Sequence, residues 1–269
     1  MDARRLALAA AVALAAAGAV APAAGAAPAR TLTAMTFNIA SAVITGNELS
    51  PIADAIDLQR PDVVGLQEVD RSWSRSDSFD QAGELALRLG MGFRFDPVLD
   101  CSALDYDNDG RCNYGTAVLS RFAIRASAVR DYALPRHDTE EPRGMGQVGV
   151  NVNGRPLTVL NTHLSEVPEA RMAQVRWILN TIRGMRGPLI LTGDFNARPG
   201  SPEIRLLTRR LRDAAAVRGL RRPTAGNSRI DYVFVSRGIT VLDARIPSSS
   251  AYRVSDHRPL IVRLRLDRT

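Results

Sequence analysis

The chain has 269 residues, of which 45% are hydrophobic and 23% are charged. This balance excludes an intrinsically disordered chain, and two cysteines are too few for a small protein built on disulfides. The 20 glycines and 15 prolines follow no fixed period, which excludes a collagen-like or low-complexity chain. One large globular domain or two small ones remain.

The basic residues are unusual in kind, because all 35 of them are arginines and lysine is absent. The formal net charge is +7. An arginine-rich chain can bind nucleic acid or phosphate groups, but the same composition arises from a GC-rich genome. The arginines are spread along the chain and do not form one dense cluster, which favours the compositional interpretation.

The first 29 residues have the pattern of a secretory signal peptide. Two arginines near the start precede an uncharged, alanine-rich run over 6–20, and small residues fill 24–29. The alternative is an uncleaved anchor helix, but the apolar run is short for a membrane span, which needs about 20 residues. We therefore expect a secreted, extracellular protein whose residues 30–269 form the mature chain.

Strand and helix patterns alternate along residues 30–269. Strands are predicted at 31–38, 62–68, 115–121, 148–152, 157–160, 189–192, 230–235, 239–244 and 259–266, and helices at 52–58, 81–89 and 169–183. Asn153-Gly154 between two of these strands is a strong hairpin signal. Because no linker or internal repeat divides the chain, the pattern predicts one α/β domain.

Polar side chains lie at the ends of several of the predicted strands, in most cases where the strand finishes, but at the start of the strand for Asp231 and just before the last strand for Asp256 and His257. They are Asn38, Glu68, His163, Asp194, Asn196, Asp231, Asp256 and His257. Strand ends are where α/β sheets gather active-site groups, although a lone Asp or Asn there is often only a turn former. Four acids in one place would repel each other without a cation, and oxygen ligands select Mg²⁺ or Mn²⁺. The set predicts metal-assisted phosphoryl chemistry.

Seven segments carry a resemblance to a known family. They are MTFNI at 35–39, DVVGLQEVD at 62–70, YGTAVLSR at 114–121, NTHL at 161–164, GDFN at 193–196, RIDYVF at 229–234 and SDHRPL at 255–260. In this order they resemble the endonuclease/exonuclease/phosphatase superfamily, which includes deoxyribonucleases, abasic-site endonucleases, sphingomyelinases and inositol-phosphate phosphatases. The resemblance implies a four-layer α/β sandwich, in which two mainly antiparallel sheets are packed together and flanked by helices. Residues 30–269 would be the catalytic domain.

The resemblance also implies a metal site. Glu68 would be the principal metal-binding carboxylate, and Asn38 would contact the metal or a water bound to it. Asp256 would support the same site. The expected ion is Mg²⁺ or Mn²⁺.

Catalytic roles follow from the same resemblance. Asp194 and Asn196 would hold the attacking water and the scissile phosphate, and either Asp194 or His257 would take the proton of that water. Asp231 would orient His257. His163 would donate to a phosphate oxygen or protonate the leaving group.

Two further residues are expected to contact the substrate, together with Asn196 and His163. Tyr114 is a weaker inference from the resemblance, because an aromatic residue is common but not universal at its position. Arg143 is a candidate phosphate contact, but an ordinary surface arginine is the favoured interpretation.

The segment 100–112 carries two independent predictions. Cys101 and Cys112 would form a disulfide in an oxidising compartment. Asp105, Asp107 and Asp109 have the spacing that opens a calcium-binding loop, but the twelfth position is a threonine and not the usual glutamate. The alternative to a structural Ca²⁺ site is a solvated acidic turn.

These features together predict a metal-dependent hydrolase in which water attacks the phosphorus of a phosphodiester or phosphomonoester in line. Extracellular DNA, phospholipid head groups and small phosphate esters are the candidate substrates, and the low aromatic content of 5% argues against a membrane-surface enzyme. A non-catalytic binding or toxin-delivery module on the same fold is the alternative, but it predicts loss of the acid and imidazole set, which is complete here. We expect a monomer without a stable protein partner.

Overall fold

The computed structural model describes residues 30–100, 111–132, 141–248 and 252–267. Two six-stranded sheets form its centre. The first contains, in spatial order, β11 (Ile239–Arg245), β12 (Leu260–Leu266), β1 (Thr31–Asn38), β2 (Val63–Arg71), β4 (Asn113–Ser120) and β3 (Gly92–Asp100). The second contains β5 (Ile124–Asp131), β6 (Gly144–Val152), β7 (Arg155–His163), β8 (Leu189–Asp194), β10 (Asp231–Val235) and β9 (Arg212–Asp213).

Most neighbouring strands in both sheets are antiparallel. The two exceptions are the central pairs β1–β2 and β7–β8, which are parallel. Each sheet therefore has one parallel pair at its middle, and the carboxyl ends of those strands lie at one edge of the sheet. This arrangement confirms the predicted pair of mainly antiparallel sheets.

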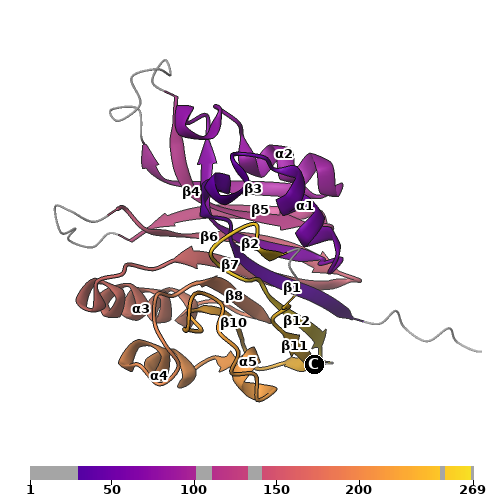
Figure 1. The fold of residues 1–269 in the computed structure, drawn as a ribbon. Coiled ribbons are helices and arrows are strands. Elements are labelled where there is room, and N and C mark those ends of the chain that lie inside the picture. Colours follow the sequence, from indigo (N-terminus) through magenta and orange to yellow (C-terminus); the bar gives the residue numbers. More distant parts are fainter. Residues whose placement is uncertain (1–29, 101–110, 133–140, 249–251, 268–269) are drawn as a thin grey trace, which may run out of the picture.

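Helices cover the outer face of each sheet, as Figure 1 shows. The helices α1 (Ser50–Asp57) and α2 (Gln81–Leu89) pack their buried residues against the first sheet. The helices α3 (Pro168–Arg183) and α4 (Pro202–Thr208) cover the second sheet, and α5 (Ala214–Val217) lies beside β10. A third core, made largely of valine and leucine, fills the space between the sheets. The four-layer α/β sandwich is thus confirmed.

A buried amide fastens the two sheets to each other near their centre. The Asn161 side chain on β7 donates to the carbonyls of Leu66 and Ala117, at 2.8 and 3.0 Å. Its oxygen accepts from Gln67 Nε2 at 2.7 Å and Thr192 Oγ1 at 2.9 Å. The amide thus donates two hydrogen bonds and accepts two. This network holds the strand ends of one sheet in a fixed position relative to those of the other.

Several sequence predictions concern residues that lie outside the described part of the chain. They are the signal peptide at 1–29, Cys101, and the candidate calcium ligands Asp105, Asp107 and Asp109. Cys112 is fully buried immediately before β4. The disulfide and the calcium site therefore stay predictions. Within the described residues, no helix is long and apolar enough to span a membrane.

Candidate active site

The site forms where the parallel strands of the two sheets end. In the second sheet, His163 at the end of β7 lies opposite Asp194 at the end of β8, and Asp231 at the start of β10 lies opposite Asp194 from the other side. Three neighbouring strands therefore place these side chains in one row. All three side chains are buried, with at most 5% of each residue exposed.

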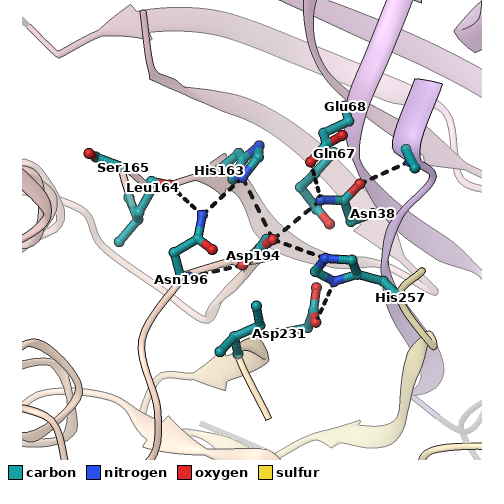
Figure 2. Close-up of polar contacts among 12 residues, drawn as sticks. Asn38, Gln67, Glu68, His163, Leu164, Ser165, Asp194, Asn196, Asp231 and His257 are labelled. Atoms are coloured by element: carbon teal, nitrogen blue, oxygen red, sulfur yellow. Dashed lines mark hydrogen bonds and ion pairs between the residues drawn. The ribbon is translucent and has the colours of Figure 1, made fainter. Parts of the chain in front are cut away.

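Glu68 and Asn38 reach this row from the first sheet. The pairing of β2 with β4 shifts between Leu66 and Val69, and Glu68 within this bulge has a φ of 53°. A bulge turns a side chain away from the regular pleat, here toward the site. Asn38 at the end of β1 then donates through Nδ2 to Glu68 Oε1 at 2.8 Å and to Asp194 Oδ2 at 3.2 Å (Figure 2). One amide thus connects carboxylates from both sheets.

Asp194 lies at the centre of the arrangement. Its Oδ1 accepts from the backbone N–H of Asn196 at 2.9 Å, and its Oδ2 is 3.6 Å from Nε2 of both His163 and His257. Burial raises the pKa of Asp194 to about 7, and the neighbouring Asp231 carboxylate adds to the increase. A carboxyl with this pKa exchanges a proton near neutral pH.

His257 is held by a carboxylate. Its Nδ1 donates to Asp231 Oδ2 at 2.9 Å, and its backbone N–H donates to Ser255 Oγ at 3.1 Å. Burial alone would lower the pKa of His257, but the Asp231 charge and hydrogen bond outweigh burial and raise the pKa to about 9. The arrangement favours the imidazolium form, with Nε2 facing Asp194.

His163 has a different partner. Its Nδ1 lies 2.9 Å from Nη1 of Arg143, and its Nε2 lies 3.2 Å from Nδ2 of Asn196. Burial lowers the pKa of His163 well below its ordinary value, and the positive charge of Arg143 adds to this effect. The site therefore contains two histidines whose surroundings favour opposite charge states.

A cleft of about 460 Å³ opens beside these residues. Glu68, Tyr114, Arg143, Ser165 and Glu166 line it. Both predicted substrate contacts, Tyr114 and Arg143, therefore lie at this cleft. Its volume is within the range of about 300–1,000 Å³ that is typical of small-molecule sites.

Asp256 differs from the buried residues of the row because it is exposed to solvent. Its Oδ1 accepts from Ser255 Oγ at 3.3 Å. Its negative charge still acts on Glu68 and His257. The structure thus brings Asn38, Glu68, His163, Asp194, Asn196, Asp231 and His257 together and leaves Asp256 at the solvent.

The donor set fits a hard divalent cation. Carboxylate oxygens of Asp194 and Asp231 lie within 4.8 Å of each other, and Asp231 Oδ1 is buried without a hydrogen-bond partner among the described residues. Burial also raises the pKa of Glu68, and the Asp256 charge opposes its ionisation further. A nearby cation would relieve both effects, and carboxylate oxygens are the ligands that Mg²⁺ and Mn²⁺ prefer.

Other residues that shape the site received no role in the sequence analysis. Ser255 donates to the Asn38 carbonyl at 2.8 Å and so ties the His257 loop to the end of β1. Trp73 packs edge-on against Tyr114, and the Arg75 guanidinium lies 3.5 Å above the Trp73 ring. Ser255 stands inside the SDHRPL segment, which is a signal that could have found it. Trp73 and Arg75 carry no such signal.

Comparison with known proteins identifies the family that this chain resembles. A family model described as "Endonuclease/Exonuclease/phosphatase family" matches residues 35–257. UPF0294 proteins of Yersinia pseudotuberculosis and Yersinia pestis are each 37% identical over 117 residues, which cover 41% of this chain and 43% of the relative. The match thus spans less than half the length of these curated relatives.

Solved structures give the same result at the level of the whole fold. An endonuclease/exonuclease/phosphatase from Beutenbergia cavernae has a TM-score of 0.70 at 26% identity, over 88% of this chain and 72% of that one. The human Nocturnin catalytic domain with bound sulfate has a TM-score of 0.67 at 22% identity, over 87% and 93% of the two chains. A mannosyl-6-phosphatase from Bacteroides thetaiotaomicron has a TM-score of 0.63 at 22% identity, over 87% and 99%. The chain belongs to the endonuclease/exonuclease/phosphatase family.

Proposed function

We propose that this protein is a secreted hydrolase of phosphate esters that requires Mg²⁺ or Mn²⁺. The observation that carries the proposal is the convergence of Glu68, Asp194 and His257, from three separate parts of the chain, on one point beside a cleft. A structural role alone gives no reason to bury several carboxylates together. Removing each charged carboxylate from water is unfavourable, and repulsion from the neighbouring carboxylates makes its ionised form still less favourable.

Glu68 would hold the cation, with Asn38 beside it and Asp256 at the solvent side. When bound, the cation would neutralise negative charge that develops on the phosphoryl oxygens and would polarise the phosphorus. Asn38 keeps Glu68 and Asp194 in a fixed relation through its two N–H groups. The carboxylates of Glu68 and Asp194, which come from different sheets, are therefore held at a fixed separation.

Asp194 would orient the attacking water and accept its proton. Its pKa of about 7 suits a base that works near neutral pH. Asn196, whose backbone N–H is bonded to Asp194, would hold the scissile phosphate through its side chain. His257, held by Asp231, would place positive charge next to the oxygens of the phosphate as the in-line attack proceeds.

A substrate panel in a single buffer tests the proposal. It contains plasmid DNA, an aromatic phosphodiester, an aromatic phosphomonoester, sphingomyelin and a phosphoinositide, each with Mg²⁺ and with a chelator. We expect hydrolysis of at least one ester, abolished by the chelator and reduced by about 10²–10⁴-fold in Asp194→Ala and His257→Ala. The surface variant Arg88→Met is the matched control, because Arg88 pairs with Glu84 away from the site. Hydrolysis that survives chelation, or that both site variants retain, would defeat the assignment.

Secretion has its own test. The apolar pattern of residues 6–20 and the small residues at 24–29 support it. Expression of the whole chain in a bacterial host should release a protein whose N-terminus, read by mass spectrometry, lies close to residue 30. Retention of an intact N-terminus in the cell membrane would favour the anchor helix.

A further inference from the structure

We propose that a pocket at the far end of the second sheet from the candidate active site is a non-catalytic binding site for a phosphate group. The pocket has a volume of about 320 Å³, and Arg209, Arg210 and Arg237 supply its positive charge. This inference goes beyond the proposed hydrolase activity and does not depend on it.

The pocket and the candidate active site lie at opposite ends of the strand β8. Leu189, the first residue of β8, lines the pocket, whereas Asp194, the last residue, lies at the centre of the candidate active site. A strand rises by about 3.3 Å per residue, so these two residues are roughly 17 Å apart. A phosphate group bound in the pocket is therefore separate from the phosphate that the cleft would hydrolyse.

Two segments that are distant in the sequence bring the arginines of the pocket together. Two of the arginines directly follow the last residue of α4, and Arg237 lies in the turn between β10 and β11. The guanidinium of Arg212 donates to the carbonyl of Ser236 at 3.5 Å and to the carbonyl of Ile239, on either side of Arg237. These hydrogen bonds hold the turn, and with it the backbone that carries Arg237, in place.

The positive charge at the pocket has no acidic partner among the described residues. The acids of the neighbouring segments pair with other arginines, which are Arg171 for Glu203, Arg229 for Asp213 and Arg265 for Asp267. Arg183 and Arg186, beside the pocket residues Met185 and Gly187, add two more exposed positive charges without an ion pair in this part of the chain. Because these like charges repel each other, an anion that binds among them is attracted by all of them.

Helix ends explain only part of this charge. A basic side chain near the C-terminus of a helix interacts favourably with the helix dipole, which accounts for Arg183 at the end of α3 and Arg209 just after α4. Arg186 and Arg237 lie in loops outside any helix, so the dipole does not account for them. A pocket that gathers guanidiniums from a helix end and from a strand turn indicates a site for an anion.

The side chains of the pocket favour a phosphate group over a simple carboxylate. A guanidinium stays charged in proteins, and its planar N–H groups match two oxygens of a phosphate or a carboxylate. Several guanidiniums around one pocket attract a doubly charged phosphate more strongly than a singly charged carboxylate. The ligand class is therefore inorganic phosphate or the terminal phosphate of a small monoester.

Calorimetric titration of the protein in low salt with a chelator tests the site. The ligands are inorganic phosphate, glycerol phosphate and acetate. We expect saturable binding of at least one of the two phosphate compounds, with a Kd on the order of 1 mM or lower, and no saturable binding of acetate. The phosphate compound that binds more tightly identifies the source of the group, and binding of neither overturns the proposal.

Two double variants separate the pocket from the overall charge of the protein. Arg210→Gln with Arg237→Gln should weaken phosphate binding by at least about 10-fold, because hydrogen bonds from two charged donors are lost. Arg60→Gln with Arg125→Gln removes the same charge from exposed arginines on other segments and should keep the wild-type affinity. Both variants keep the cleft residues, so phosphate bound at the cleft contributes equally to both. Equal affinities of the two variants would overturn the proposal.

Urea unfolding gives a second measurement. A ligand that binds only the folded state stabilises it, so phosphate should raise the urea midpoint of the control double variant more than that of the pocket variant at equal ionic strength. If the pocket variant does not fold, Arg237→Gln alone takes its place, because Arg237 is exposed in a turn. It should bind phosphate several-fold more weakly than wild type, and an unchanged affinity would contradict the proposal. If the protein hydrolyses no ester, the proposed function fails while these titrations still decide the phosphate site.

Discussion

Two residues of the site hold backbone conformations that side-chain-bearing residues usually avoid. Glu68 has a φ of 53° and Asn196 a φ of 48°, and neither is a glycine. Such conformations cost on the order of 1–3 kcal/mol each and persist where the surroundings hold them. Asn38 bonds the Glu68 side chain, and Asp194 bonds the Asn196 backbone. The unfavourable backbone conformations and the polar contacts that hold them therefore occur at the same residues.

The Asp231–His257 pair predicts a defined pH dependence of stability. The pKa of His257 is raised to about 9 in the folded protein, from 6.5 when unfolded. The pair therefore contributes fully below about pH 6.5, and the contribution is lost as pH rises through 9. In chelated protein, Asp231→Asn should lower the free energy of unfolding by roughly 2–3 kcal/mol at pH 6 and by much less at pH 10. An equal loss at both pH values, measured by urea unfolding, would contradict this coupling.

At the scale of the elements, the edge strand β3 contains a buried acid outside the site. Asp96 on β3 has a fully buried side chain, and Arg94 Nε donates to its Oδ1 at 3.3 Å. Its Oδ2 has no hydrogen-bond partner among the described residues. A Cβ on Gly146 would lie 1.9 Å from that oxygen, so β6 approaches as closely as it does because residue 146 has no side chain.

Removing the charge of Asp96 should stabilise the protein. Burial raises the pKa of Asp96 to about 7, so the folded state holds the proton more tightly than the unfolded state does. The cost of ionisation grows as pH rises from about 4 to 7 and is constant above that. Asp96→Asn should therefore raise the free energy of unfolding by roughly 2–4 kcal/mol at pH 8 and by little at pH 4. Stability that is unchanged at pH 8 would show that the carboxylate is not penalised.

The hydrophobic strands and amphipathic helices were predictable because each is local. The predicted ranges 31–38 and 81–89 coincide with β1 and α2. The strands β3 and β5 were missed, since β3 contains a proline and exposed positions that weaken its pattern and β5 alternates with small residues. Most of the site set could be listed from strand ends, but the Arg143 contact with His163 could not, because it depends on how β6 pairs with β7.

At the scale of the whole molecule, the site exists because two sheets meet in a fixed relation. Glu68 and Asn38 belong to one sheet, and Asp194 and His163 belong to the other. Gly65 on β2 permits the approach, since a Cβ there would lie 2.2 Å from Thr192 Oγ1. A shift of one sheet along the other would separate the carboxylates from the histidines.

The bridging amide of Asn161 should therefore matter for both stability and activity. Asn161→Ala leaves the buried carbonyls of Leu66 and Ala117 without their donor, and each unsatisfied group costs about 1–3 kcal/mol. We expect the free energy of unfolding to fall by roughly 2–4 kcal/mol in a urea titration. Asn180→Ala, at an exposed position on α3, is the matched control and should change little. Equal stabilities of the two variants would show that the bridge does not hold the sheets.

The Mg²⁺ dependence of ester hydrolysis in Glu68→Gln is the most direct measurement of the central claim, which is that Glu68 holds a catalytic cation beside Asp194 and His257. The wild-type rate should rise with Mg²⁺ concentration, saturate, and disappear when a chelator is added. Glu68→Gln keeps the size of the side chain but loses its charge, so it should need far more Mg²⁺ or lose activity by about 10²–10³-fold. A variant with the wild-type rate and the wild-type Mg²⁺ dependence would contradict the account.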